Sequence, residues 1–166
     1  MKDRSRWLSL SSCVLIVGAA ILALGVWLGS AQHAAGATTL CVQPGSVSCF
    51  STISAALSAA NDGDTIQVAA GTYIEYVVIT KTVTVQGGWN ADFTARDPSA
   101  HPTIIRPPDA SFSVVHIQGQ FGVPTATRPT FDGFIVTGGG GGNHGGGIRV
   151  TSSNAIISTM VPTVAP

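Results

Sequence analysis

Five short runs of β-forming residues recur along the chain: Thr65-Ile-Gln-Val68, Thr82-Val-Thr-Val-Gln86, Ser113-Val-Val-His-Ile-Gln118, Phe134-Ile-Val-Thr137 and Gly147-Ile-Arg-Val-Thr151. Gly, Asn or Pro follows each run, and the runs are spaced by roughly 15 to 30 residues with little helical periodicity between them. Short strands that recur at such intervals are typical of a solenoid, in which each coil shelters its neighbour. The sequence therefore predicts an all-β solenoid.

Other segments complete this pattern. Further strands are expected at Thr39–Val42 and Thr103–Arg106, Gly71-Thr-Tyr73 is expected to be a turn, and Gly119–Thr130 is expected to be an irregular insert. Alternation predicts that Val83 and Val85 face the interior.

One segment near the start of the repeats has the pattern of a helix. The stretch Ser51–Ala60 is rich in alanine, and it places Ile53, Ala56, Leu57 and Ala60 at helical spacing. A hydroxyl residue at its start can cap the first backbone amides. We expect a short N-terminal helix that covers the open end of the first coil, which would otherwise expose its apolar interior.

The N-terminus has the pattern of an export signal. A basic cluster precedes Trp7–Leu28, which carries no charge, and the most apolar part, Cys13–Leu28, has 16 residues. As a helix that part is about 24 Å long, shorter than the roughly 30 Å hydrocarbon layer. Small residues follow at Ala35-Gly-Ala37. These features favour a removed signal peptide and a mature start at Thr38, with Gly29-Ser-Ala31 as a second cleavage pattern.

An uncleaved signal anchor is the alternative. Leu8 and Leu10 can extend the apolar stretch, and Lys2, Arg4 and Arg6 would keep that end in the cytoplasm. In both cases the residues after 37 lie outside the cell, so we expect an extracellular or cell-surface protein that meets the membrane only through its N-terminal segment.

The charge of the exported part argues against nucleic acid as a partner. Beyond residue 37 the chain has five Lys or Arg residues and seven Asp or Glu residues, with no basic run. Affinity for nucleic acid comes mainly from clustered basic side chains on phosphates. We therefore set nucleic-acid binding aside.

Cys41 and Cys49 are the two cysteines of the exported part. In an oxidising compartment they are expected to form a disulfide, which would stabilise the fold by about 2.5 kcal/mol in the chain-entropy model. Two buried free thiols are the alternative. A metal pair is disfavoured because no histidine lies nearby in the sequence to complete a tetrahedral site.

Several motifs resemble a known family. The segment Ile53–Tyr73, the turn Gly87-Gly-Trp-Asn90 and the pair Phe131–Gly139 and Gly145–Val150 are similar to coils of right-handed parallel β-helix proteins of the pectate-lyase-like superfamily. The resemblance spans about residues 39–158 and implies that fold for the N-terminal part of such a protein. The family includes polysaccharide lyases and hydrolases, surface adhesins and other secreted proteins, so the resemblance specifies fold better than activity.

Catalytic residues are not evident. Family enzymes carry calcium-binding acids and a basic residue on the outer face of central coils, whereas this chain has no paired acids at such positions. We expect Asp62 and Asp64 to bond nearby backbone in a turn. We expect Asp92, Arg96 and Asp97 to form ion pairs within one loop, with a calcium site as the alternative. The sequence thus predicts no catalytic residue, no cofactor-binding residue and no metal ligand.

Two aromatic residues are candidates for carbohydrate contact. Trp89 and Tyr73 can stack on sugar rings if they are exposed, although packing against the edge of a coil is the alternative. The histidines His101, His116 and His144 have no neighbouring nucleophile in the sequence, and His116 lies in an alternating strand where it either points inward or faces outward alone.

The predicted organisation has three parts. Residues 1–37 form a signal peptide or signal anchor, residues 38–158 form the N-terminal coils of a β-helix, and residues 159–166 form an irregular tail with two prolines, which suggests a truncated reading frame. The predicted function is that of a secreted or cell-surface module with a binding or structural role, whose partner is extracellular or cell-wall polysaccharide. The alternative is the N-terminal fragment of a polysaccharide lyase or hydrolase that lacks its catalytic coils.

Overall fold

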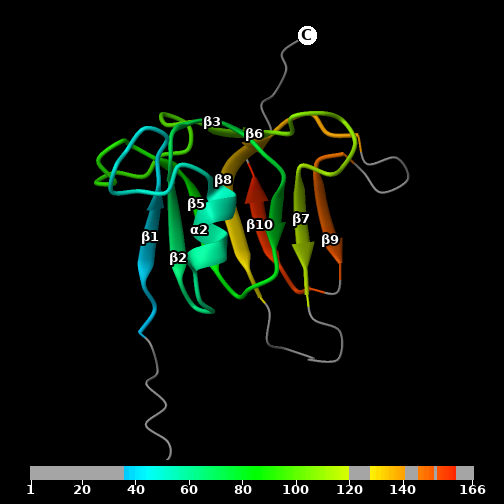
Figure 1. The fold of residues 1–166 in the computed structure, drawn as a ribbon, viewed down its shortest axis with the longest axis horizontal. Helices are drawn as coiled ribbons and strands as arrows, with labels where there is room; N and C mark the ends of the chain where they lie inside the picture. The colour runs from blue at the N-terminus through cyan, green and yellow to red at the C-terminus, as the bar shows by residue number, and fades with distance from the viewer. Residues whose placement is uncertain (1–35, 120–127, 141–145, 152, 160–166) are drawn as a thin grey trace, which may run out of the picture. The chain divides into compact units, whose positions relative to one another are not determined.

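The computed structural model describes residues 36–119, 128–140, 146–151 and 153–159. In these ranges the chain forms parallel strands and a single short helix (Figure 1). In chain order the elements are β1 (Thr39–Val42), α2 (Ile53–Ala59), β2 (Thr65–Ala69), β3 (Gly71–Ile74), β4 (Val77–Ile79), β5 (Thr84–Trp89), β6 (Thr103–Arg106), β7 (Val115–Gln118), β8 (Thr130–Val136), β9 (Ile148–Thr151) and β10 (Ile156–Thr159). The predicted all-β class is confirmed.

The strands form two parallel sheets. The larger sheet has the strand order β1-β2-β5-β8-β6-β3, with β10 beside β8, and the smaller sheet has the order β4-β7-β9. Strands that lie three apart in chain order pair repeatedly: β2 with β5, β5 with β8, β3 with β6, and β4 with β7. Corresponding parts of successive repeats therefore lie side by side.

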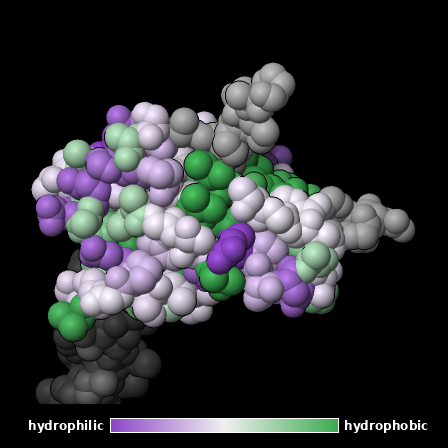
Figure 2. Space-filling model, turned by 90° about the horizontal axis from the view of Figure 1, so that it is seen from above, coloured by the Kyte–Doolittle hydropathy of each residue, from purple (hydrophilic) through white to green (hydrophobic). Residues whose placement is uncertain are grey.

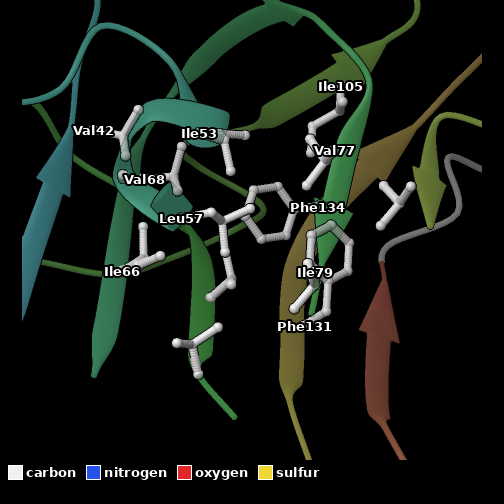
Figure 3. Close-up of a cluster of buried hydrophobic side chains, with 14 of the residues drawn as sticks. Val42, Ile53, Leu57, Ile66, Val68, Val77, Ile79, Ile105, Phe131 and Phe134 are labelled. Atoms are coloured by element: carbon white, nitrogen blue, oxygen red, sulfur yellow. The ribbon is translucent and has the colours of Figure 1, made fainter. Parts of the chain in front are cut away.

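Apolar side chains at matching positions of these strands form the core (Figure 3). Ile66 pairs with Val85, and Val85 pairs with Phe131, so three fully buried side chains lie in one row across the larger sheet. Alternation along each strand places these residues inside and their neighbours outside. The expected orientation of Val83 and Val85 toward the interior is confirmed.

Helix α2 confirms the predicted helix within two residues at each end. The side chain of Thr52 caps it by accepting a hydrogen bond from the Ala55 amide, and Ile53, Ala56 and Leu57 are buried. The helix contacts β1, β2 and β4. In Figure 1 it lies in front of the strands, and its buried apolar side chains belong to the core cluster.

Two segments predicted as turns are strands. Gly71-Thr-Tyr73 belongs to β3, which pairs with β6 over its whole length. Gly87-Gly-Trp89 is the second half of β5. Glycine is uncommon in strand interiors, and for that reason these segments were expected to interrupt the strands; pairing with neighbouring repeats overrides that local preference.

The surface of the described chain exposes several large apolar side chains. Figure 2 shows an apolar band between more polar flanks on the face seen from above. The exposed large apolar residues are Val47, Ile74, Val78, Phe112, Val150, Ile156 and Ile157. Val78 and Phe112 line one hollow, which is considered below.

Some predictions concern residues outside the described ranges. These are the export segment before residue 36, the middle of the insert predicted over Gly119–Thr130, His144 and the tail after Thr159. Among the described residues, no helix is both long and apolar enough to cross a membrane.

Candidate functional site

Two hollows lie along the outer side of β4 and share the side chains of Tyr76 and Val78. One has a volume of about 420 Å³ and is lined by Ser54, Leu57, Ser58, Tyr76, Val78, Thr80 and Lys81. The other has a volume of about 270 Å³ and is lined by Tyr76, Val78, Phe112, Ser113, His116 and Arg149. We call the two together the β4 groove.

The floor of the β4 groove is a row of outward-facing side chains from the smaller sheet. In the parallel register Val78 pairs with His116, and His116 pairs with Arg149. Their neighbours Val77 and Val115 point inward and are fully buried. Alternation therefore places one apolar, one imidazole and one guanidinium side chain in line across three strands.

An aromatic pair forms one wall. The rings of Tyr76 and Phe112 meet edge to face, with centroids 5.6 Å apart and an interplanar angle of 82°. The Tyr76 hydroxyl donates to the Asp109 carboxylate (2.6 Å), and the same carboxylate oxygen accepts a bond from the Ser111 amide (2.8 Å). These bonds fix the loop that carries Phe112, which is 67% exposed.

The bond between Tyr76 and Asp109 affects the pKa values of both groups. It is the main cause that raises the pKa of the Tyr76 hydroxyl. The pKa of Asp109 is lowered, first by its hydrogen bond from Ser111 and then by the bond from Tyr76. At neutral pH the wall therefore contains a protonated phenol and an ionised carboxylate.

Helix α2 forms the opposite wall and contributes Ser54, Leu57 and Ser58. Glu75 holds its first turn by accepting bonds from the backbone amides of Ile53 and Ser54, each 2.9 Å long. Lys81 holds its last turn by donating to the carbonyl oxygens of Leu57, Ser58 and Ala60. Carboxylate at the first turn and ammonium at the last turn both match the helix dipole.

Arg149 and His116 give the groove its polar character. Within the described ranges the Arg149 guanidinium makes no hydrogen bond or ion pair, whereas His116 Nε2 lies 2.9 Å from the Thr151 hydroxyl. Burial, and secondarily the charge of Arg149, lowers the pKa of His116. At neutral pH the floor thus presents one cation and one uncharged imidazole, which suits an anionic, hydroxyl-rich ligand.

The two cysteines lie away from this groove and form the predicted disulfide. Cys41 and Cys49 are bonded, with their Cα atoms 4.9 Å apart. The bond ties β1 to the segment that leads into α2, and Phe50 continues this segment as a bridge partner of Val42. The disulfide prediction is confirmed.

The two aromatic residues proposed from the sequence for carbohydrate contact are not part of the β4 groove. Tyr73 is only 3% exposed, and its hydroxyl donates to the carbonyl of Ala69 at 3.0 Å. Both faces of its ring are in the core, so this burial corrects the expectation that it can stack on a sugar. Trp89 is half-buried at the end of β5, and its indole Nε1 is buried without a partner among the described residues.

The acidic residues mostly bond backbone. Asp62 accepts from the Thr82 amide, and Asp64 accepts from the amides of Thr38 and Asn61, as expected for these turn residues. Arg96 differs from the prediction, because it pairs with Asp132 at 2.5 Å and not with an acid of its own loop. In the described ranges no group of three or more His, Cys, Asp or Glu residues could hold a metal ion.

Sequence reasoning missed Tyr76, Phe112 and Arg149 as a group. Alternation in Val77–Ile79 gives an outward Val78, but only the parallel register brings β7 and β9 beside it. Phe112 lies before β7 in a loop, where no periodicity predicts its direction. The alternation in the sequence therefore indicated the outward side chain on the floor of the β4 groove, but no sequence pattern indicated its aromatic wall.

Comparison with known proteins adds no family to this description. Neither the protein-family models, nor the curated proteins, nor the solved structures gave a match to this chain.

Proposed function

We propose that this chain is a secreted or cell-surface module with a right-handed parallel β-helix fold, which binds extracellular or cell-wall polysaccharide in the β4 groove. The observation that carries the proposal is the row Val78, His116 and Arg149 beside the aromatic pair Tyr76 and Phe112. A floor with one apolar side chain, one imidazole and one cation that has no partner among the described residues, beside an aromatic wall, matches an acidic sugar chain.

The strand pairing supports the β-helix. A β-helix requires three sets of parallel strands in which each strand pairs with its counterpart one coil later. The sets β2-β5-β8, β3-β6 and β4-β7-β9 have that arrangement, and α2 covers the core as a capping helix would. The resemblance to pectate-lyase-like proteins adds support from the sequence for the handedness.

The chemistry of the β4 groove supports an acidic polysaccharide as the ligand. Apolar faces of sugar rings lose water when they pack on aromatic side chains such as Phe112. A uronate carboxylate can accept paired hydrogen bonds from the planar guanidinium of Arg149. The β4 groove consists of two adjoining hollows of about 420 Å³ and 270 Å³, which suits a ligand with more than one sugar unit.

Calorimetric titration of the exported protein with acidic oligosaccharides tests this proposal. Oligogalacturonate is the charged probe, and its methyl-esterified form is the neutral control. We expect saturable binding to the charged probe, about 10-fold weaker for Arg149→Gln, corresponding to about 1.4 kcal/mol. Phe112→Ala is expected to weaken binding to both probes.

Matched controls come from outside the groove. Arg106→Gln removes an exposed cation on β6, and Ile74→Ala removes an exposed apolar side chain on β3. Both variants are expected to bind like the unaltered protein. The proposal fails if no acidic oligosaccharide binds, or if Arg149→Gln and Phe112→Ala both leave the affinity unchanged.

An absorbance assay with the same oligogalacturonate separates the alternative of a polysaccharide lyase. A lyase would release unsaturated oligosaccharides, whose ultraviolet absorbance rises with time when calcium is present. Steady release of such product would replace the binding module with the lyase alternative.

A further inference from the structure

Thr38 is held firmly just before the first strand. Its backbone nitrogen donates to Asp64 Oδ1 at 2.7 Å, and its carbonyl oxygen accepts from the Thr65 amide at 2.9 Å. The second oxygen of Asp64 accepts from the Asn61 amide at 2.7 Å. Thr38 thus has a fixed position at which its nitrogen points toward a carboxylate.

Asp64 is an unusual partner for a backbone amide because its side chain is nearly inaccessible. The residue is 3% exposed, and among the described residues it is one of two buried polar or charged residues. A buried carboxylate is costly unless a positive charge or several hydrogen bonds compensate it. Lys81 attracts it only as the weakest contributor to its lowered pKa, so within the described chain the compensation comes mainly from neutral amides.

The peptide bond before Thr38 is accessible, in contrast to Asp64. Residues 36–39 are all exposed. The sequence before this bond, Ala35-Gly-Ala37, has the small residues at alternate positions that signal peptidases require. One position therefore combines an accessible bond, a cleavage pattern and a nitrogen already aligned on a carboxylate.

We propose that export processing hydrolyses the Ala37–Thr38 bond and that the new α-ammonium group of Thr38 forms an ion pair with Asp64. A signal peptidase breaks the C–N bond, and water adds a hydroxyl to the Ala37 carbonyl carbon and a proton to the Thr38 nitrogen. The proton released by the new Ala37 carboxylic acid converts the Thr38 amine into an ammonium group. The proposal rests on the proposed export, but not on polysaccharide binding.

This ion pair would make the stability of the fold depend on cleavage of the Ala37–Thr38 bond. Before cleavage the Asp64 carboxylate has a neutral amide donor at 2.7 Å, and after cleavage it has an ammonium at the same position. The carboxylate already makes this bond charge-assisted, and a positive charge on the donor adds Coulomb attraction between two opposite unit charges. The mature chain is therefore more stable than one that continues past Thr38, and the turn at Asn61–Asp64 anchors its first residue.

The first experiment locates the mature N-terminus. The full chain is secreted from a bacterial host, and the intact mass and N-terminal peptide of the product are measured. We expect a product that begins at Thr38. A product that begins at Gln32 would overturn this inference while leaving export intact, whereas a product that retains Met1 would overturn export as well.

The second experiment measures the ion pair. Chains that begin at Thr38 or at Gly36 are released from a cleavable tag and melted, each with and without Asp64→Asn. We expect the Thr38 chain to have a Tm higher by about 4 °C, and this difference to vanish with Asp64→Asn. Asp62→Asn, which removes the neighbouring exposed acid, is the matched control and is expected to preserve the difference.

A third preparation guards against misfolding of Asp64→Asn. Acetylation of the Thr38 chain at its N-terminus keeps an N–H donor but removes the charge. We expect its Tm to fall to that of the Gly36 chain. Equal Tm values for the free and acetylated Thr38 chains, or a difference between the two chain starts that survives in a folded Asp64→Asn variant, would refute the ion pair.

Discussion

Phe131 and Phe134 stack face to face inside the core, with ring centroids 4.3 Å apart and an interplanar angle of 11°. Both side chains are fully buried. Residues three apart in a regular strand face opposite sides, so the stack requires a break in the alternation. Gly133 provides it with a φ of 80°, and β8 pairs with β5 before this point and with β6 after it.

Replacing Gly133 by alanine is expected to destabilise the protein by about 2 kcal/mol or more, because the left-handed conformation alone costs about 1 to 2 kcal/mol for other residues. The added Cβ would also lie 2.6 Å from Arg96 Nη2 and 2.7 Å from the Gly87 carbonyl oxygen. Urea unfolding measures the effect. Gly147→Ala is the matched control, since a Cβ there meets no atom within 4 Å; an equal loss in both variants would contradict the explanation.

The sequence predicted the strands best where alternation was uninterrupted. The bounds of β1 and β6 agree with the prediction at both ends, and β2 agrees within one residue. The corner at Gly133 was not predicted, because a glycine with positive φ looks the same in sequence as a turn that ends a strand. The identity of the paired strands also had to come from the structure.

The candidate site was less predictable than the strands. Tyr73 was a candidate for sugar contact only if exposed, with packing as the alternative, and it lies in the core, whereas Tyr76, three residues later, lines the β4 groove. The turn between β3 and β4 decides which of the two faces outward, and this turn has no periodic pattern. Arg96 likewise forms its ion pair with Asp132, which is remote in sequence, and not with an acid of its own loop.

Glu75 is expected to stabilise the helical wall of the groove. Glu75→Ala leaves the amides of Ile53 and Ser54 without their acceptors, which should lower the free energy of unfolding by about 1 to 3 kcal/mol. Glu75→Gln keeps one acceptor and should lose about half as much. Asp92→Ala removes an exposed acid that makes no hydrogen bond or ion pair with other described residues, and it is the control for charge alone; urea unfolding should show almost no change for it.

Asp64 is expected to make stability depend on acid pH. Its pKa is lowered, mainly by the hydrogen bonds from the Asn61 and Thr38 amides. A group with a lowered folded pKa contributes stability above its unfolded pKa of about 3.9, and that contribution is lost as the pH falls through the folded value.

Unfolding measured between about pH 5 and pH 2 should therefore show a shallower loss of stability for Asp64→Asn than for the unaltered protein. Some slope remains in the variant, because the pKa values of Asp97 and Asp109 are lowered as well. Identical slopes in the two proteins would show that the Asp64 bonds do not contribute.

Tyr76→Phe tests whether oligosaccharide binding requires that the loop carrying Phe112 be held in place by the Tyr76 hydroxyl. The change removes the hydroxyl that bonds Asp109 but keeps the ring that meets Phe112. Loss of this bond frees the loop that carries Phe112, so we expect oligogalacturonate binding to weaken by about 3- to 10-fold, or roughly 0.7 to 1.4 kcal/mol. Stability should change by less than about 1 kcal/mol, because the hydroxyl is exposed and can bond water.

Tyr73→Phe is the matched variant and should have the opposite profile. Its hydroxyl donates to the Ala69 carbonyl in the core, so its loss should lower the free energy of unfolding by about 1 to 3 kcal/mol and leave binding unchanged. Calorimetric titration and urea unfolding of both variants separate the two roles. If Tyr73→Phe impaired binding as much as Tyr76→Phe at equal stability, the β4 groove would not be the binding site, because only Tyr76 lines it.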